Sequence, residues 1–221
     1  MASKGHSQET VRSNPRAGIK LATPQPTSHE KAMKSDQERW DKRWKLHKDA
    51  FPEPDPFLVE HVHLLSPGRA LDLACGLGAN ALFLAEHGFV VDALDISFPA
   101  LRTLQAEAAR RRLVVNCAVV DLDYFPLPRR FYEVVLVFAF YATSLIAPIK
   151  AALKPGGFVV YATFNSRHRS VKPDFNPKYL IEPEGLARNF AEYAICVHES
   201  DAGEERNVSR IVARKPPGAS F

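Results

Sequence analysis

One stretch of the sequence, residues 68–80, constrains the fold more than any other. It reads Gly-Arg-Ala-Leu-Asp-Leu-Ala-Cys-Gly-Leu-Gly-Ala-Asn. Residues 70–73 predict a short and largely apolar strand, while Gly76 and Gly78 allow the backbone to turn with positive φ and to approach a ligand closely. Residues 81–85 continue as a helix. A strand, a glycine turn and a helix N-terminus in this order are typical of a nucleotide-type cofactor cradle, because free backbone amides face the bound molecule.

The charge at the end of this strand discriminates between two classes of cofactor. Gly76-x-Gly78-x-x-Ala81 also satisfies the loose dinucleotide fingerprint that allows alanine in third place. However, Asp72 precedes the first glycine, where a carboxylate would repel a pyrophosphate and would suit an ammonium group. S-adenosylmethionine carries an ammonium and a sulfonium group, and Asp95 supplies the acidic partner that its ribose needs. The sequence therefore favours S-adenosylmethionine, and an NAD(P)-dependent oxidoreductase is the disfavoured alternative.

Four separate stretches resemble the class I S-adenosylmethionine-dependent methyltransferases, whose first motif is an acidic residue followed by Gly-x-Gly. The stretches are Asp72–Gly78, Asp95–Ser97, Val120–Leu122 and Leu153–Gly157, and the resemblance runs from Trp40 to Pro216. It implies that an acid at Asp121 accepts a hydrogen bond from the adenine amino group and that Leu122 packs on the ring. The cofactor-binding residues expected on this basis are Arg43, Asp72, Ala74, Gly76, Gly78, Asp95, Ile96, Asp121, Leu122 and Phe138.

A predicted helix over residues 36–47 carries Trp40 and Trp44 one turn apart, so that both rings lie on one face. One interpretation is a packing stripe that holds the helix on the domain. In the resembling family, an N-terminal helix with Trp or Tyr residues folds over the cofactor. That resemblance makes Trp40, Arg43 and Trp44 a candidate lid, with Arg43 a candidate partner of the methionine carboxylate. Both interpretations stay open at the level of sequence.

The order of the remaining segments predicts an α/β fold. Strands and helices alternate, as expected for an open parallel sheet whose ligands bind at the carboxyl ends of the strands. We expect a Rossmann-like, mostly parallel seven-stranded sheet with helices on both faces and a C-terminal antiparallel hairpin. Residues 154–157 predict a tight turn and residues 165–180 a loop. The strands expected after the first are residues 89–95, 113–120, 134–140, 158–164, 194–199 and 207–215, with a turn at 201–203 between the last two.

Two segments are candidates for binding and activating a methyl acceptor. The turn at residues 141–144 would lie beside the transferred methyl group, and the basic loop beyond the fifth strand is where the resembling family often builds its acceptor pocket. Tyr141 and His168 are the candidate catalytic residues, with structural or solvated roles as the alternative. The cations of the loop would suit an anionic or thiol-type acceptor. Cys75 has no evident base and is interpreted as a small packing residue.

Within the resembling family, the chain is most similar to the small-acceptor branch that includes the tellurite-resistance methyltransferases. It departs from this branch at Ala79, where the branch commonly has Arg, and at Ala162, where it commonly has Glu. The branch also often carries an Arg near Thr143 and Ser144. The acceptor of the branch is therefore not transferred to this chain. Methylation of RNA or protein, and a catalytically inactive cofactor-binding interaction module, remain the alternatives.

Composition bounds these interpretations. The chain has 221 residues, and we expect a disordered basic tail over residues 1–35 followed by one methyltransferase domain over residues 36–217. Residues 1–34 hold six Lys/Arg and two Glu, so the net charge of +4 leaves 23 basic and 23 acidic residues in the rest. A neutral body argues against a nucleic-acid partner.

The expected partner is a small-molecule acceptor. No apolar run approaches the roughly 18 residues needed to cross a bilayer, so no membrane association is expected. The three cysteines have no C-x-x-C spacing, so neither disulfides nor a metal site is expected. These features suit a cytoplasmic protein, either a monomer or a homodimer.

Overall fold

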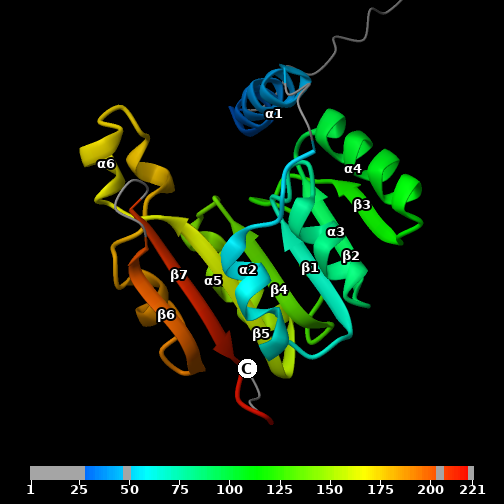
Figure 1. Cartoon of the computed structure of the whole chain (residues 1–221). Helices are drawn as coiled ribbons and strands as arrows, with labels where there is room; N and C mark the ends of the chain where they lie inside the picture. The colour runs from blue at the N-terminus through cyan, green and yellow to red at the C-terminus, as the bar shows by residue number, and fades with distance from the viewer. Residues whose placement is uncertain (1–27, 47–50, 203–206, 219–221) are drawn as a thin grey trace, which may run out of the picture.

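The computed structural model describes residues 28–46, 51–202 and 207–218 (Figure 1). The described residues form one seven-stranded sheet in the order β3-β2-β1-β4-β5-β7-β6. The pairs from β3 to β5 are parallel, whereas β7 is antiparallel to both β5 and β6. The predicted fold class is therefore confirmed. The strands are β1 (Arg69–Leu73), β2 (Val90–Asp95), β3 (Val115–Val119), β4 (Tyr132–Phe138), β5 (Leu153–Phe164), β6 (Ala194–Ala202) and β7 (Val208–Arg214).

Helices cover both faces of the sheet, and each face has its own hydrophobic cluster. Leu71 and Leu73 of β1 pack toward α5 and α7, while Ala70 packs toward α2, α3 and α4. The helices are α1 (Ser28–Leu46), α2 (Pro56–His61), α3 (Ala79–Glu86), α4 (Phe98–Arg111), α5 (Ile146–Ala152), α6 (His168–Val171) and α7 (Gly185–Asn189). The described residues also form three short 3-10 helices, η1 (Val62–Leu64), η2 (Thr143–Leu145) and η3 (Pro177–Tyr179).

The apolar character of β4 follows from its position in the middle of the sheet. Val135 and Val137 belong to the cluster under α5 and α7, and Val134 and Leu136 belong to the cluster on the opposite face. All four side chains are fully buried. A parallel strand covered on both faces needs apolar side chains at every position rather than at alternate ones.

The expected tight turn at residues 154–157 is instead part of a strand. β5 begins at Leu153, and its register with β4 shifts between Tyr132 and Val134. Gly156 has φ of 78° and provides the irregularity, which makes this segment a bulged strand start rather than a turn. The expected loop at 165–180 contains α6 and η3. Part of the expected hairpin turn at 201–203 lies in β6, and residue 203 falls outside the described ranges.

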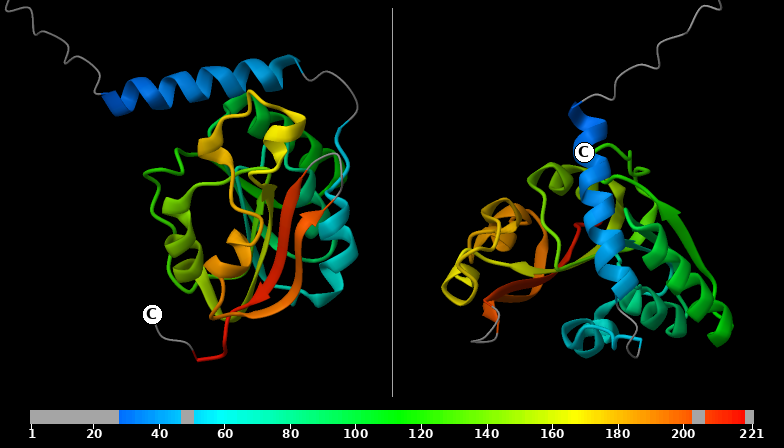
Figure 2. Two further views of the ribbon diagram at one scale, coloured as in Figure 1. Left: turned by 90° about the vertical axis from the view of Figure 1, so that its left-hand side faces the viewer. Right: turned by 90° about the horizontal axis from the view of Figure 1, so that it is seen from above.

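Helix α1 begins at Ser28 rather than at the expected Asp36, so the predicted start of this helix is wrong. The sequence Glu-Lys-Ala-Met-Lys at residues 30–34 consists of good helix formers, which a search for hydrophobic periodicity alone overlooks. Residues 1–27, the rest of the predicted tail, lie outside the described residues. Figure 2 shows α1 lying across the edge of the domain at which the parallel strands end. Of the described helices, none has an apolar stretch long enough to cross a bilayer.

Candidate cofactor and acceptor site

The carboxyl ends of the central parallel strands meet at one edge of the sheet (Figure 1). Asp72 and Asp95 belong to the last two residues of β1 and β2. Asp72 is paired in register with Ala93 of β2 and Leu136 of β4. Asp95 is the last residue of β2 and is paired with Val119 of β3. Asp121 follows β3 closely. This is the edge at which open α/β sheets bind ligands.

The glycine turn connects β1 to α3 through two left-handed glycines. Gly76 has φ of 55° and Gly78 has φ of 75°, conformations that glycine adopts without strain. The amide of Gly76 donates a hydrogen bond to Oδ2 of Asp95 at 2.8 Å, which ties the turn to the end of β2. Ala74 also has a positive φ, 55°, although it carries a Cβ. The backbone therefore enters the turn in a left-handed conformation before the first glycine.

Asp72 is a buried acid with an unusual environment at this edge. Its side chain is 2% exposed, and its Oδ2 accepts no hydrogen bond from the described residues. Burial raises the pKa of Asp72 to about 8, with a further contribution from the nearby Asp95 and a partial offset from the backbone of Ala81. A buried carboxylate oxygen without a partner suits a cationic ligand group, because such a group would restore the interactions lost with water.

Asp95 is held more completely than Asp72. Its two carboxylate oxygens accept hydrogen bonds from the backbone amides of Gly76 and Ser97, both at 2.8 Å. Burial nevertheless raises the pKa of Asp95, and the backbone hydrogen bonds from Ser97 and Gly76 offset this only in part. The half-buried Ile96 follows directly. Asp95 therefore fixes the shape of the glycine turn, and its contact with a ribose stays a prediction.

Asp121 and Leu122 are brought to the same edge by the backbone. The amide of Val120 donates to the carbonyl of Asp95 at 2.9 Å, and Oδ1 of Asp121 accepts from the amide of Asp123 at 3.0 Å. Leu122 packs against the cluster under α5 and α7. The half-buried Phe138 ends β4 and packs against the cluster on the other face. These positions are compatible with the predicted adenine contacts.

Helix α1 contacts both halves of this edge. A Cβ at Gly76 would lie 2.9 Å from Cζ2 of Trp44, so the indole ring lies directly over the glycine turn. Ser97 Oγ donates to Oδ1 of Asp41 at 2.6 Å, and Nη2 of Arg39 lies 3.5 Å from the hydroxyl of Tyr179 beyond β5. The arrangement agrees with the lid interpretation, which stays a prediction.

Arg43 lies above the two indole rings of α1. Its guanidinium carbon is 5.4 Å from the ring centroid of Trp40 and 5.7 Å from that of Trp44. The two rings are themselves stacked, with centroids 6.3 Å apart. Arg43 is thus close to the ring that covers Gly76, and its predicted contact with a methionine carboxylate remains a prediction.

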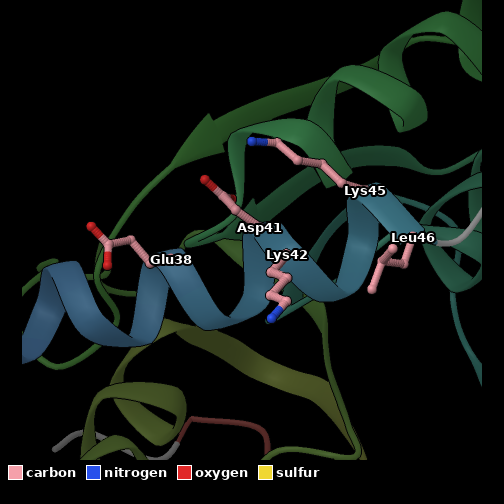
Figure 3. Close-up of a pocket in the computed structure, with 5 residues that line it drawn as sticks. All are labelled: Glu38, Asp41, Lys42, Lys45 and Leu46. Atoms are coloured by element: carbon pink, nitrogen blue, oxygen red, sulfur yellow. The ribbon is translucent and has the colours of Figure 1, made fainter.

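Two hollows lie near this edge, and they differ in how they are built. The first, of about 300 Å³, is lined by residues of α1 alone, namely Glu38, Asp41, Lys42, Lys45 and Leu46 (Figure 3). The second, of about 400 Å³, lies beside Tyr141 and is called here the Tyr141 cavity. Its walls come from the segments after β4 and after β5 and from α7, and its lining residues are Tyr141, Thr143, Pro177, Lys178, Leu180, Ile181, Glu182, Gly185, Arg188 and Asn189. Of these two hollows, the second alone brings several elements together.

A match to a known family agrees with this geometry. The family model described as tellurite resistance protein TehB matches residues 44–208. The chain belongs to the TehB family. The resemblance to the tellurite-resistance branch expected from the sequence is thereby confirmed.

Individual relatives of this TehB family member share 26–32% sequence identity with it over part of its length. Hemagglutinin 1 of Eikenella corrodens is 29% identical over 154 residues, which cover 65% of this chain and 50% of the relative. Ribosomal RNA small subunit methyltransferase C of Alcanivorax borkumensis is 32% identical over 108 residues, 45% of this chain and 33% of the relative. The probable S-adenosyl-L-methionine-dependent methyltransferase TehB of Haemophilus influenzae is 26% identical over 107 residues, 46% of this chain and 37% of the relative. The chain thus spans half or less of the length of these curated relatives.

Among solved structures, that of TehB from Haemophilus influenzae is similar with a TM-score of 0.62 and 18% sequence identity. The similarity covers 81% of this chain and 66% of the other. It supports the fold. The two departures from the branch lie close to the site: Ala79 is the first residue of α3, and the buried Ala162 pairs with Phe138. Neither alanine offers the charged group expected of the branch.

His168 is packed among aromatic rings in this TehB family member. It is in α6, is 8% exposed, and packs between the rings of Phe164 and Phe175, at centroid distances of 4.3 and 4.8 Å. It is not among the residues that line the Tyr141 cavity. These surroundings suit packing rather than proton transfer to a molecule beside Tyr141, so the two predicted catalytic residues do not line one cavity.

Cys75 also has the character of a packing residue. Burial raises the pKa of its thiol well above the usual range, and the nearby Asp72 and Asp95 raise it further. The thiol is therefore held in its protonated form at neutral pH, which is the unreactive one. Among the described residues, no three His, Cys, Asp or Glu side chains cluster in a way that could bind a metal ion.

Several residues near the site carry no signal in the sequence. Arg188 and Asn189 belong to α7, and only the return of the chain after β5 brings this helix to Tyr141. Tyr161 lies in a predicted strand. Its buried hydroxyl forms no hydrogen bond with the described residues and lies near Tyr141 and the backbone of Ala142. No local pattern marks these residues, because each depends on contacts between distant segments.

Proposed function

We propose that this TehB family member is an S-adenosylmethionine-dependent methyltransferase that acts on a small-molecule acceptor. The observation that carries the proposal is the unpartnered Oδ2 of the buried Asp72 beside the glycine turn. A carboxylate there favours the ammonium group of the cofactor and disfavours a pyrophosphate. The name of the Haemophilus influenzae relative supports the same cofactor.

The residues at the strand ends would hold the cofactor along this edge. Asp72 would bind the ammonium group, Asp95 the ribose hydroxyls and Asp121 the adenine amino group, while Gly76 lets the backbone approach closely. The other predicted contacts come from Arg43, Ala74, Gly78, Ile96, Leu122 and Phe138. When bound, S-adenosylmethionine supplies an electrophilic methyl group. The protein then has to align the acceptor with that group and exclude water.

Tyr141 is the residue best placed to position the acceptor. It follows β4, the strand next to β1, and it lines a cavity of about 400 Å³. Thr143 Oγ1 donates to the hydroxyl of Tyr141 at 3.2 Å, so the proton of Tyr141 is left to donate elsewhere. A thiol, a chalcogen oxyanion or another small anion would fit this environment, since Lys178 and Arg188 also line the cavity.

Methylation of RNA is the alternative favoured by a specific observation, the similarity to the ribosomal RNA methyltransferase of Alcanivorax borkumensis. Against it stand the equal numbers of acidic and basic residues outside the first 34. RNA-binding surfaces carry a marked excess of Lys and Arg. Protein methylation and a catalytically inactive cofactor-binding module are further outcomes of the experiment that follows.

The experiment combines cofactor binding with a search for methylated products. Calorimetry of the full chain should show binding of S-adenosylhomocysteine and no binding of NAD(H). Asp72→Asn should weaken this binding at least about tenfold, whereas Asp174→Asn, an exposed acid outside the site, should leave it unchanged. Incubation with methyl-labelled cofactor should transfer label to small thiols or small anions.

Label in RNA or protein would contradict the choice of acceptor. Tight cofactor binding without label in any acceptor would favour the inactive module. Binding of a dinucleotide with no binding of S-adenosylhomocysteine would overturn the cofactor as well.

A further inference from the structure

The Tyr141 cavity is larger than a simple inorganic anion requires. Its volume is about 400 Å³. An oxyanion with three oxygens fills on the order of 100 Å³, taking about 30 Å³ for each water-sized atom. Cavities of about 300 Å³ and above are the size that holds organic ligands. A small oxyanion would therefore leave most of this cavity to water.

The charged residues of the cavity favour a negatively charged group. Lys178 and Arg188 both line it, and neither forms an ion pair with any described residue. The one acidic residue in the lining, Glu182, accepts a hydrogen bond from Ser166 Oγ at 3.1 Å. Other cations nearby are already paired, since Arg167 contacts Asp201 and Lys150 contacts Glu192.

Other parts of the wall are apolar. Pro177, Leu180 and Ile181 line the cavity together with the two cations. Asn189 also lines it, although its Nδ2 is buried. The cavity thus combines two cations with apolar side chains.

We propose that the acceptor is an organic anion, a molecule with an apolar body and a carboxylate-type group, rather than a bare inorganic oxyanion. Arg188, with Lys178, binds the anionic group. The apolar body lies against Leu180 and Ile181. The end of the molecule opposite the anionic group then lies beside Tyr141, which follows β4. This inference rests on the proposed function for the location of the methyl donor, but it concerns the specificity of the Tyr141 cavity alone.

The experiment measures binding of matched probes to the full chain saturated with S-adenosylhomocysteine. The probes are carboxylates of increasing size, from hexanoate to 4-phenylbutanoate, each paired with its neutral amide, together with selenite and inorganic phosphate. Protein-observed NMR titration reports both affinity and the residues affected. The carboxylates should bind at least tenfold more tightly than their amides and than both inorganic ions.

Variants locate the site of this binding. Arg188→Met should weaken carboxylate binding at least tenfold and leave amide binding unchanged, and Lys178→Met should weaken it less. Arg169→Met removes a cation of α6 that does not line the cavity and should have no effect. An unchanged affinity for S-adenosylhomocysteine shows that each variant is folded.

Three results would overturn the inference. The first is equal binding of carboxylates and amides, and the second is tighter binding of selenite or phosphate than of any carboxylate. The third is failure of every carboxylate to bind while S-adenosylhomocysteine still does. Failure of S-adenosylhomocysteine itself would instead contradict the proposed function, so the two failures are distinguishable.

Discussion

At the scale of single residues, the site depends on acids that water does not solvate. Asp72 lies between β2 and β4 and reaches no described hydrogen-bond donor with Oδ2, whereas Asp95 is satisfied by two backbone amides. The two acids therefore differ in role. Asp95 fixes the shape of the glycine turn, whereas Oδ2 of Asp72 has no partner among the described residues and would be stabilised by a positively charged group.

The raised pKa of Asp72, about 8, gives a pH dependence with a definite sign. A carboxyl whose pKa rises on folding stabilises the folded state at low pH, and this contribution is lost as pH rises through about 8. Binding of an ammonium group needs the ionised form, so the affinity for S-adenosylhomocysteine should increase by up to about tenfold per pH unit from pH 6 toward 8.

Calorimetry over this pH range checks the prediction, and proton release on binding should accompany it. Asp72→Asn should flatten the pH dependence and should make the ligand-free protein at least as stable at pH 8. An affinity that is constant or that falls between pH 6 and 8 in the parent protein would contradict this account.

Several residues of the candidate site could be predicted because they lie close together in the sequence. Asp72, Gly76 and Gly78 belong to one short segment whose spacing carries its own geometry. The pKa of Asp72 was not predictable, because it depends on burial by other elements. Likewise, the left-handed φ of Ala74 and the aromatic packing of His168 arise from tertiary structure.

At the scale of elements, the junction of α3 with α4 depends on a glycine. A Cβ at Gly78 would lie 2.5 Å from Cδ1 of Leu104, which is fully buried. Gly78 also has a left-handed φ of 75°. The start of α3 can therefore approach α4 only without a side chain at this position.

Substitution of this glycine separates the effect of close packing from that of backbone strain. Gly78→Ala should lower the free energy of unfolding by about 2–4 kcal/mol, the sum of left-handed strain and overpacking. Gly88→Ala is the matched control, since Gly88 has φ of 83° but a Cβ added there would meet no atom within 4 Å, and it should cost only about 1–2 kcal/mol. Urea unfolding measures both. Equal losses in the two variants would show that Leu104 adapts freely.

The elements themselves followed largely from sequence, with informative exceptions. The continuous apolar run of β4 and the order of strands and helices were sufficient for the fold class. The strand start at Leu153 and the helix at His168 were missed because bulges and short helical turns depend on pairing and packing partners. Helix α1 was recognised, but its beginning was misplaced because its first turns lack a hydrophobic period.

At the scale of the whole molecule, α1 connects two regions that the sheet keeps separate. Asp41 contacts Ser97 after β2, while Arg39 contacts Tyr179 beyond β5. The indole of Trp44 lies over Gly76, at the same edge of the sheet. Movement of α1 would therefore change its contacts with the segment after β2 and with the segment beyond β5 at the same time.

The indole of Trp44 should report cofactor binding directly. The chain has two tryptophans, so Trp40→Phe leaves Trp44 as the sole strong emitter. Its fluorescence should change in intensity or wavelength when S-adenosylhomocysteine binds beside the glycine turn, with saturation at the calorimetric affinity. Trp44→Phe, in which only Trp40 emits, should respond less. An unresponsive Trp44 in a protein that binds the ligand would refute its proximity to the cofactor.

The arrangement of the last two strands has a consequence for assembly of the chain. β6 precedes β7 in the sequence, yet within the described sheet it hydrogen-bonds to β7 alone, and β7 alone joins it to β5. During synthesis, β6 can therefore pair with a strand only after the residues of β7, which follow it in the sequence, have been made. Without Val208–Arg214, β6 would have no strand to pair with, and β5 would become the edge strand of the sheet. Pairing of this segment therefore completes the sheet.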